Sequence, residues 1–359
     1  MNREFIRAIG ELEKEKGISK DILVEAIELA LLSAYKKNYG TSQNVRVSID
    51  REEGDIDVLM RRDIVETVQD DLSEISLEEA LEIDNRFVVG DYVEYQVTPR
   101  DFGRIAAQTA KQVVVQRIRE AERGMVFDDY INRQGEIVTG VVQRISNETV
   151  FINMGKAEGI LAATEQAPGE TYTVNERIKV YVMDVKKTTK GPQIYLSRSH
   201  PGIVKKLFEL EVPEIQDGSV VIKSIAREAG SRTKIAVYTE DESIDPVGAC
   251  VGARGNRVQS VVDELFGEKI DIITWSSDPE TLISKVLSPA KVEKVTINED
   301  EKSATAVVPD YQLSLAIGKE GQNVRLAAKL SGWKIDIKSH TQFFSDSSEE
   351  TQYADEESE

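Results

Sequence analysis

Two short segments of the sequence repeat each other around a pair of glycines. One is residues 252–255 (Gly-Ala-Arg-Gly), and the other, 66 residues further along the chain, is residues 318–321 (Gly-Lys-Glu-Gly). Glycines at both ends allow two helices to meet in a tight turn and allow the backbone of a ligand to approach closely. Backbone N–H groups at the start of the following helix attract phosphate. We therefore predict that both segments, called here the first and second glycine loops, bind the phosphates of a nucleic acid.

The elements around the two loops repeat as well. In each copy an apolar-periodic helix follows the loop, and a strand with the pattern Lys-Ile-Asp-Ile ends the copy, at residues 269–272 or 334–337. Each copy begins with a helix and two strands, which we expect at residues 220–226, 234–239, 292–298 and 304–308. This order resembles the prokaryotic type of KH module, which implies a loop that clamps about four nucleotides. A P-loop is excluded, because neither segment contains Gly-x-x-x-x-Gly-Lys-Ser/Thr.

The loops and the helix starts behind them are the candidate RNA contacts. Positive charge would come from Arg254 and Arg257 in the first copy and from Lys319 and Arg325 in the second, whereas Glu320 is expected to weaken the second loop. The alternative, two helix-connecting turns with no ligand, is disfavoured by the repetition. The candidate RNA-binding residues are Gly252, Ala253, Arg254, Gly255, Asn256, Arg257, Gly318, Lys319, Glu320, Gly321, Gln322, Asn323 and Arg325.

Between residues 134 and 199 the sequence changes to short strands and turns. We expect five strands, at residues 135–142, 149–155, 158–161, 177–185 and 193–198, which is the number in an OB-type barrel. The segments Phe-Ile-Asn-Met-Gly and Glu-Gly-Ile-Leu resemble the S1 RNA-binding family, whose members stack bases on aromatic side chains. This chain keeps Phe151, but Glu148 and Ala162 stand where the family commonly has an aromatic residue and a histidine. Two interpretations stay open, a barrel that binds RNA weakly and an inert spacer.

The first 125 residues indicate a mixed α/β domain. Helical spacing of apolar residues predicts helices at residues 2–15, 20–37, 76–82 and 101–123. Alternating apolar and polar residues around Glu53-Gly54 predict a β-hairpin of residues 45–49 and 55–59, and a further strand is expected at residues 92–97.

Four cations of this domain are a candidate patch. Arg104 and Lys111 lie two turns apart on the longest predicted helix, so their side chains point the same way. They would form a basic patch with Lys36 and Lys37 if the two helices bring the four side chains together. The alternative is that all four are ordinary solvated residues, since lysines in a last helical turn also complement the helix dipole.

The composition excludes several classes of function. The 359 residues include 45 Lys or Arg and 64 Asp or Glu, a formal net charge of −19, which argues against coating of nucleic acid by overall positive charge. The single cysteine, Cys250, forbids an internal disulfide, fits a cytoplasmic protein and is expected to be a small core residue. With only His200 and His340 besides, we expect no metal site and no cofactor. No apolar run approaches the ~18–20 residues of a membrane span.

The last segment is strongly acidic. Residues 341–359 contain seven Asp or Glu and no Lys or Arg. Such a segment buries too little apolar surface to offset the entropy of ordering, so we predict a disordered tail. Two roles stay open for it, a solubilising tail and a mimic of nucleic acid that competes for a basic surface.

The whole order of segments resembles the NusA family of bacterial transcription termination/antitermination proteins. The most specific matching text is at residues 98–113, 196–199 and 318–324. The resemblance implies a multidomain α+β fold with a mixed α/β N-terminal domain, a five-stranded OB-fold S1 barrel, two tandem prokaryotic-type (type II) KH domains and a disordered acidic tail. The implied boundaries are 1–125 for the RNA-polymerase-binding domain, 134–199 for the S1 domain, 201–276 and 279–340 for the KH domains, and 341–359 for the tail.

The resemblance also implies a function, that of a non-enzymatic elongation factor expected to be a cytoplasmic monomer. The N-terminal domain would dock on the RNA polymerase core near the RNA exit channel, and the patch of Lys36, Lys37, Arg104 and Lys111 would meet the emerging RNA hairpin. The S1 and KH domains would hold nascent single-stranded RNA. The factor would modulate pausing, intrinsic termination and, with other antitermination factors, antitermination.

Two other classes of protein are the alternatives to this function. One is a ribosome- or translation-associated RNA-binding protein. The other is a phosphorolytic exoribonuclease, for whose catalytic domains residues 1–125 are too short.

Overall fold

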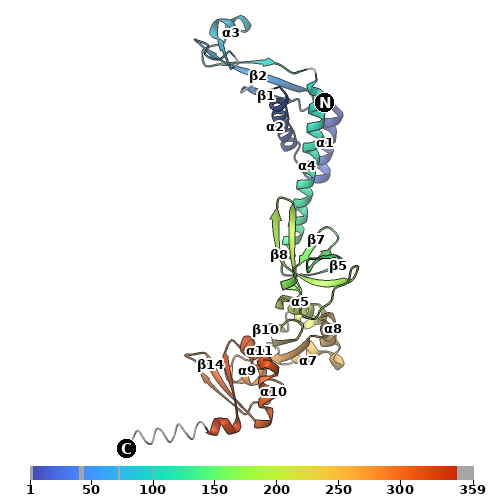
Figure 1. Ribbon diagram of the computed structural model, residues 1–359, viewed down its shortest axis with the longest axis vertical. Coiled ribbons are helices and arrows are strands. Elements are labelled where there is room, and N and C mark those ends of the chain that lie inside the picture. The colour runs from blue at the N-terminus through green and yellow to red at the C-terminus, as the bar shows by residue number, and fades with distance from the viewer. Residues whose placement is uncertain (1–2, 40–43, 72, 100, 346–359) are drawn as a thin grey trace, which may run out of the picture. The chain divides into compact units, whose positions relative to one another are not determined.

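The N-terminal part of the chain is built around one long strand. The computed structural model describes residues 3–39, 44–71, 73–99 and 101–345, and the chain forms two compact units, Met1–Val126 and Phe127–Glu359 (Figure 1). In the first unit β2 (Ile56–Val65) pairs antiparallel with β1 (Val45–Ile49) and β4 (Tyr92–Gln96), and parallel with β3 (Glu74–Ser76). The predicted hairpin is confirmed, and the helices of this part of the chain are α1 (Arg3–Lys16), α2 (Lys20–Tyr39), α3 (Leu77–Ile83) and α4 (Phe102–Ile131).

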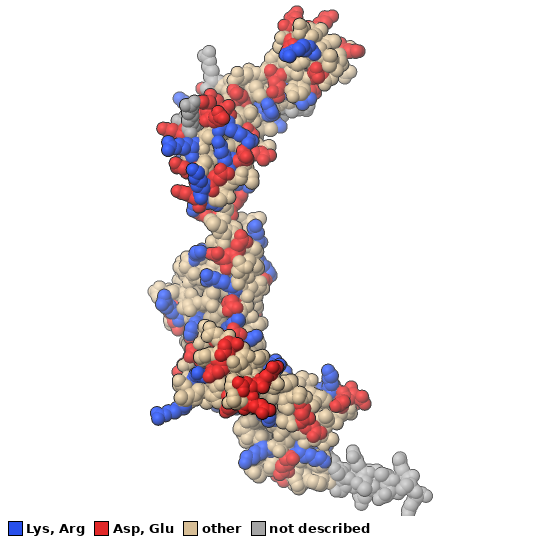
Figure 2. Space-filling view, turned by 180° about the vertical axis from the view of Figure 1, so that it is seen from behind, with Lys and Arg blue, Asp and Glu red and all other residues tan. Residues whose placement is uncertain are grey.

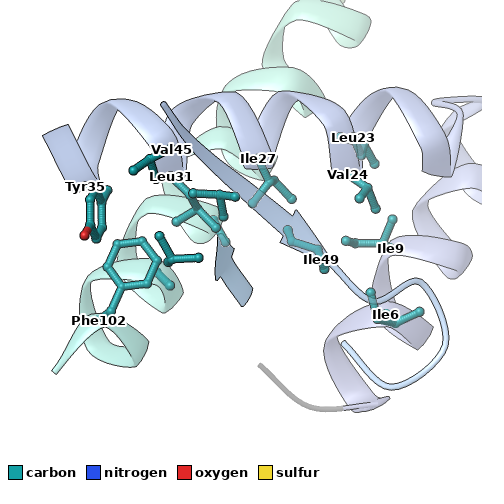
Figure 3. Packing of buried hydrophobic residues seen from close by; sticks show 14 residues of the cluster. Ile6, Ile9, Leu23, Val24, Ile27, Leu31, Tyr35, Val45, Ile49 and Phe102 are labelled. Carbon is teal, nitrogen blue, oxygen red and sulfur yellow. The ribbon is translucent and has the colours of Figure 1, made fainter. Parts of the chain in front are cut away.

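The main core of this unit lies between the sheet and the helices α1, α2 and α4 (Figure 3). On α2, Leu23, Ile27 and Leu31 recur every fourth residue, and all three are fully buried. The rings of Tyr35 and Phe102 meet edge to face with their centroids 5.7 Å apart, which joins the end of α2 to the start of α4. The periodicity that predicted these helices is therefore the one that buries them.

A second, smaller cluster lies at the far end of β2. It contains Ile64, Ile75, Ala80 and Val93, from β2, β3, α3 and β4. Ser76 is the N-cap of α3, because its side chain accepts a hydrogen bond from the backbone N–H of Glu79.

Helix α4 extends well beyond the predicted end at residue 123 and ends at Ile131. Gly124 lies inside it, although glycine costs about 1 kcal/mol in a helix interior. Contacts at the end of the helix offset that cost: Tyr130 donates a hydrogen bond to the carbonyl of Met154 at 3.0 Å, and Asp129 pairs with Lys156 at 2.6 Å. Both partners belong to the barrel that follows, so tertiary contacts override the local preference.

The second unit starts with a closed five-stranded barrel, as predicted. Its strands pair in the order β5-β6-β7-β9-β8, and the only parallel pair is β7 with β9. Val142, Ile152, Leu161 and Val180 point inward and are fully buried. The strands are β5 (Ile137–Ser146), β6 (Thr149–Asn153), β7 (Glu158–Leu161), β8 (Arg177–Thr188) and β9 (Gly191–Ser197).

Two copies of one α/β arrangement follow the barrel. In each, two strands form an antiparallel hairpin, and the last strand pairs parallel with the second strand of the hairpin. The strands are β10 (Val221–Glu228), β11 (Arg232–Tyr238) and β12 (Lys269–Thr274) in the first copy, and β13 (Lys294–Asn298), β14 (Ser303–Val308) and β15 (Lys334–Ser339) in the second. The helices are α5 (Pro201–Glu211), α6 (Pro213–Gln216), α7 (Pro246–Val251) and α8 (Asn256–Glu264), then α9 (Pro279–Val286), α10 (Leu313–Ile317) and α11 (Gln322–Ser331).

The two copies share a hydrophobic core. Ala226, Ala236 and Ile273 of the first copy belong to the same buried cluster as Ile283 and Leu326 of the second. Burial of apolar surface at about 25 cal/mol per Å² is the main force that holds such elements together. The predicted element order of both KH modules is confirmed, and the shared core joins them directly.

The start of the acidic tail is ordered, which corrects the predicted disorder of the whole segment 341–359. Residues 340–345 are helical, and Thr341 Oγ1 donates to Asp310 Oδ2 at 2.9 Å. The remaining residues of the tail, 346–359, lie outside the described residues. Among the residues that are described, no helix has the length and apolar character needed to cross a membrane.

Candidate nucleic-acid interface

The two glycine loops have the same backbone conformation. The opening glycine has φ/ψ of 75°/178° in the first loop and 78°/172° in the second. The third residue, Arg254 or Glu320, has 56°/23° or 53°/28°, and the closing glycine has 80°/11° or 73°/17°. Two segments of different sequence thus form one shape, as their repetition predicts.

The shape of the loop requires glycine at its opening position. The φ/ψ values there belong to a region that essentially only glycine occupies. A Cβ atom on Gly318 would also lie 2.7 Å from the backbone nitrogen of Asn323, and one on Gly252 would lie 2.5 Å from Asn256 Oδ1. At the closing glycine of either loop a Cβ atom would meet nothing closer than 3.9 Å.

The residues inside each loop are exposed to solvent. Ala253 and Arg254 are exposed in the first loop, and Lys319 and Glu320 in the second. Asn256, which begins α8, is exposed as well. The third residue pays about 1–2 kcal/mol for its left-handed conformation. The two loops therefore present the same backbone conformation to a ligand. At the third position, however, the first loop carries a positive charge and the second a negative charge.

Two of the predicted contact residues have structural partners instead of an exposed position. Arg257 donates to the carbonyl of Ala249 at 2.6 Å and pairs with Glu214 at 2.9 Å. Asn323 is buried and donates to the carbonyls of Ala316 and Leu287 at 2.9 and 3.0 Å. Both side chains tie the helix behind the loop to the helix in front of it. In this structure they position the loop, which a motif alone cannot reveal.

Gln322 and Arg325, also predicted contacts, bind the first KH domain. Both side chains hydrogen-bond to Glu228 at the end of β10, and Gln322 also reaches Ser231 in the following turn. The second glycine loop therefore lies against the β10–β11 turn of the neighbouring domain.

On the barrel, the ring of Phe151 is covered on one face by Arg144. The guanidinium carbon lies 3.4 Å from the ring centroid, and Glu158 holds the same guanidinium group in an ion pair of 2.9 Å. A base that approaches this face meets a flat cation, on which bases also stack. Glu148, one of the two departures from the family pattern, lies with Asn147 in the β5–β6 turn at positive φ.

A basic hairpin on the barrel was not predicted from the sequence. Lys186, Lys187 and Lys190 lie at or next to the turn between β8 and β9, and all three are exposed. Lys186 lies 5.2 Å from the ring centroid of Tyr195 on β9, so cation and aromatic ring are combined there. The signal was present as three lysines within five residues.

Buried ion pairs join the barrel to the first KH domain. The fully buried guanidinium group of Arg198 binds Glu170 of the barrel at 2.6 Å and the carbonyl of Glu264 in α8 at 2.8 Å. Tyr172 donates to the same Glu170, and burial and that neighbouring carboxylate raise the pKa of Tyr172.

A second buried pair lies next to the first. Arg227 of β10 binds Glu268 at 2.9 Å and donates to the carbonyls of Arg198 and His200 in the connection between the two domains. Glu268 also accepts hydrogen bonds from the backbone of Gly230 and from Thr233. The relative placement of barrel and KH domain is thus held by satisfied buried charges.

In the N-terminal unit the four cations of the proposed patch are all exposed. Lys36 and Lys37 lie in the last turn of α2, beside Tyr35, which contacts Phe102 at the start of α4. Arg104 follows in the first turn of α4, and Lys111 lies two turns further on. The packing of Tyr35 on Phe102 thus brings the end of α2 to the start of α4.

The face of each unit that Figure 2 shows carries mixed charge. Figure 2 shows blue and red side chains interspersed on the visible face of each, with no large field of one sign. Binding of RNA would therefore depend on local geometry rather than on the net charge.

Within the described part of the chain, no group of His, Cys, Asp and Glu side chains is placed to hold a metal ion.

Comparison with known families covers nearly the whole chain. Residues 4–124 match the NusA N-terminal domain, residues 132–197 the S1 RNA binding domain, and residues 198–275 and 279–344 the NusA-like first and second KH domains. The solution structure of the N-terminal domain of NusA from Bacillus subtilis is similar over 34% of this chain and 99% of that one, with 61% identity and a TM-score of 0.32.

Whole-length relatives agree with these matches. The transcription termination/antitermination protein NusA of Bacillus subtilis (strain 168) is 60% identical over 341 residues, which cover 95% of this chain and 92% of that protein. The protein of the same description from Halalkalibacterium halodurans is 59% identical and covers 95% and 90%. The chain therefore belongs to the NusA family of transcription termination/antitermination proteins.

Proposed function

We propose that this factor binds the RNA polymerase core near the RNA exit channel through its N-terminal unit, and nascent RNA through its S1 and KH domains. Because the chain belongs to this family, it is a non-enzymatic transcription factor. The two alternative classes, a ribosome-associated protein and an exoribonuclease, are therefore rejected. The observation that carries the RNA contact is the pair of glycine loops, which share one backbone shape and leave their inner residues exposed. Joined by a common core, the two KH domains would bind one RNA strand as a single body.

A mechanism follows from this arrangement. Attachment to polymerase raises the local concentration of the emerging transcript around the KH domains, so a modest intrinsic affinity suffices. The net charge of −19 keeps that intrinsic affinity low for RNA in general. Support of a hairpin at the exit channel would prolong pausing and assist intrinsic termination. Capture of single-stranded RNA together with other antitermination factors would favour antitermination.

We also propose that the factor acts in the cytoplasm as a monomer.

The loops are tested by adding negative charge to both. The variant of the full chain carries aspartate at four positions: Ala253→Asp, Arg254→Asp, Lys319→Asp and Glu320→Asp. It should bind a labelled single-stranded RNA at least about tenfold more weakly, because carboxylates repel the phosphates that the loops hold. Fluorescence anisotropy measures the affinity, and co-elution with polymerase should persist.

The matched control places asparagine at the same four positions. Asparagine tolerates left-handed backbone as aspartate does but carries no charge. An unchanged affinity of the aspartate variant, or an equal loss in the asparagine variant, would contradict phosphate binding by the loops.

The patch on α2 and α4 is tested on pausing. Arg104→Ala with Lys111→Ala should shorten the pause at an RNA hairpin by about two- to fivefold, in line with the modest contribution of exposed cations, and should barely change the affinity for free RNA. Pause half-lives are measured in a transcription assay with purified polymerase. The control is Arg7→Ala with Arg86→Ala, which removes two exposed arginines elsewhere in the same unit. If both pairs leave the pause unchanged, the four cations are only a solvated surface.

A further inference from the structure

A carboxylate of the first KH domain occupies a set of anion-binding side chains on the second. Glu228 accepts a hydrogen bond from Arg325 Nε at 2.6 Å and one from Gln322 Nε2 at 2.9 Å. Gln322 Nε2 also reaches Ser231 Oγ at 2.7 Å. The hydrogen bond from Arg325 lowers the pKa of Glu228, and the nearby charges of Arg325 and Lys329 add to this, so the side chain is an anion at neutral pH.

The donors form a row along one face of α11. Gln322, Arg325 and Lys329 are spaced by three and four residues, so their side chains lie above one another. A guanidinium group with a neighbouring amide and ammonium group suits phosphate as well as carboxylate. The row begins directly behind the second glycine loop, and Arg325 also donates to the carbonyl of Glu320, the third residue of that loop, at 3.0 Å.

We propose that Glu228 stands in for an RNA phosphate at this row, and that RNA binding to the second KH domain displaces it. The inference rests on the proposed RNA binding and adds a residue that limits it: Glu228 keeps Arg325 and Gln322 occupied until a phosphate replaces its carboxylate. The second loop would then bind RNA less tightly than its cations allow, for a reason that lies in the other domain.

The structure allows the displacement. The Arg325 side chain is 48% exposed and that of Glu228 is 23% exposed, so water and RNA can reach the pair. The domain interface does not depend on it, because the two domains share a hydrophobic core and Lys234, which is fully buried, donates to the carbonyl of Ser288 at 2.7 Å. A partly exposed ion pair contributes little to stability.

The test removes the charge of Glu228 and keeps its shape. In the full chain, Glu228→Gln should bind a labelled mixed-sequence single-stranded RNA about fivefold more tightly at 0.1 M salt, the factor expected when one more phosphate releases its counterions. The slope of log affinity against log salt should steepen by about 0.7 for the same reason. Adding Arg325→Gln should abolish both gains.

Glu240→Gln is the matched control, since it removes one exposed carboxylate just beyond the other end of β11. Equal affinities of Glu228→Gln and Glu240→Gln would overturn the inference. A lower affinity of Glu228→Gln together with a lower thermal midpoint would also overturn it, because Glu228 would then only link the domains. Failure of the unaltered chain to bind the RNA would instead overturn the proposed RNA binding, and this inference with it.

Discussion

Replacing Arg227 with methionine is expected to destabilise the C-terminal unit by about 3–5 kcal/mol, the usual cost of removing one partner from a buried ion pair. The side chains of Arg227 and Glu268 are both 0% exposed. Methionine would leave the Glu268 carboxylate buried with only the backbone of Gly230 and the hydroxyl of Thr233 as donors. It would also leave the carbonyls of Arg198 and His200 without the guanidinium group that joins them to β10.

Calorimetry of the full chain measures this loss as a drop in the midpoint of the unfolding transition of the second unit. The control is Lys205→Met on α5, which removes a pair with Glu209 whose side chains are 53% and 27% exposed, and should cost less than about 1 kcal/mol. A double variant with methionine at both 227 and 268 should recover part of the loss, because no isolated charge remains buried. Equal midpoints for the Arg227 and Lys205 variants would refute the structural role of the pair.

Replacing Gly230 with alanine should separate the barrel from the first KH domain. Gly230 has φ +73°, and its Cβ atom would lie 2.0 Å from the carbonyl oxygen of Pro168 in the barrel. That oxygen belongs to the backbone, so one domain must move against the other. Backbone strain and the forced movement should together cost roughly 2–5 kcal/mol.

Gly218→Ala is a closely matched control in the same KH domain. Gly218 has φ +84°, and a Cβ atom there would meet nothing within 4 Å. Alanine at 218 therefore carries the strain alone, about 1–2 kcal/mol. The difference between the two thermal midpoints reports the contact between domains, and RNA affinity should fall only in the Gly230 variant. Identical midpoints would show that the turn yields without disturbing the interface.

Local patterns were enough to predict most of the elements and the positions of both glycine loops. The apolar spacing of α2, the alternation around Glu53-Gly54 and the repeat of Gly-x-x-Gly all act within a few residues of the chain. Strand β3, only three residues long, was missed, because it carries too little pattern. Helix α4 was predicted too short, because glycine, here Gly124, is unfavourable inside a helix and indicates an end. The end of the helix is instead held by contacts of Tyr130 and Lys156.

The partners of the site residues could not be predicted, because they depend on contacts between segments far apart in the chain. Arg257, Asn323 and Arg325 read as three cationic or polar residues behind a loop, yet they bind Glu214, Leu287 and Glu228 respectively. Nothing near Arg325 in the sequence points to a carboxylate 97 residues away. A charged residue near a phosphate-binding motif is therefore a candidate RNA contact. Only the fold shows which of these side chains already bind another residue of the chain.

The single thiol of the chain is unreactive in the folded protein. Cys250 is fully buried in the first KH domain, and burial raises the pKa of its thiol to about 12. At neutral pH the thiol therefore stays protonated, whereas the thiolate is the reactive form. Mild oxidants and maleimide dyes should therefore leave the native chain unmodified. One cysteine introduced on an exposed turn of each unit would then give two labelled positions, which suits the chain for spectroscopic distance measurements between its two units.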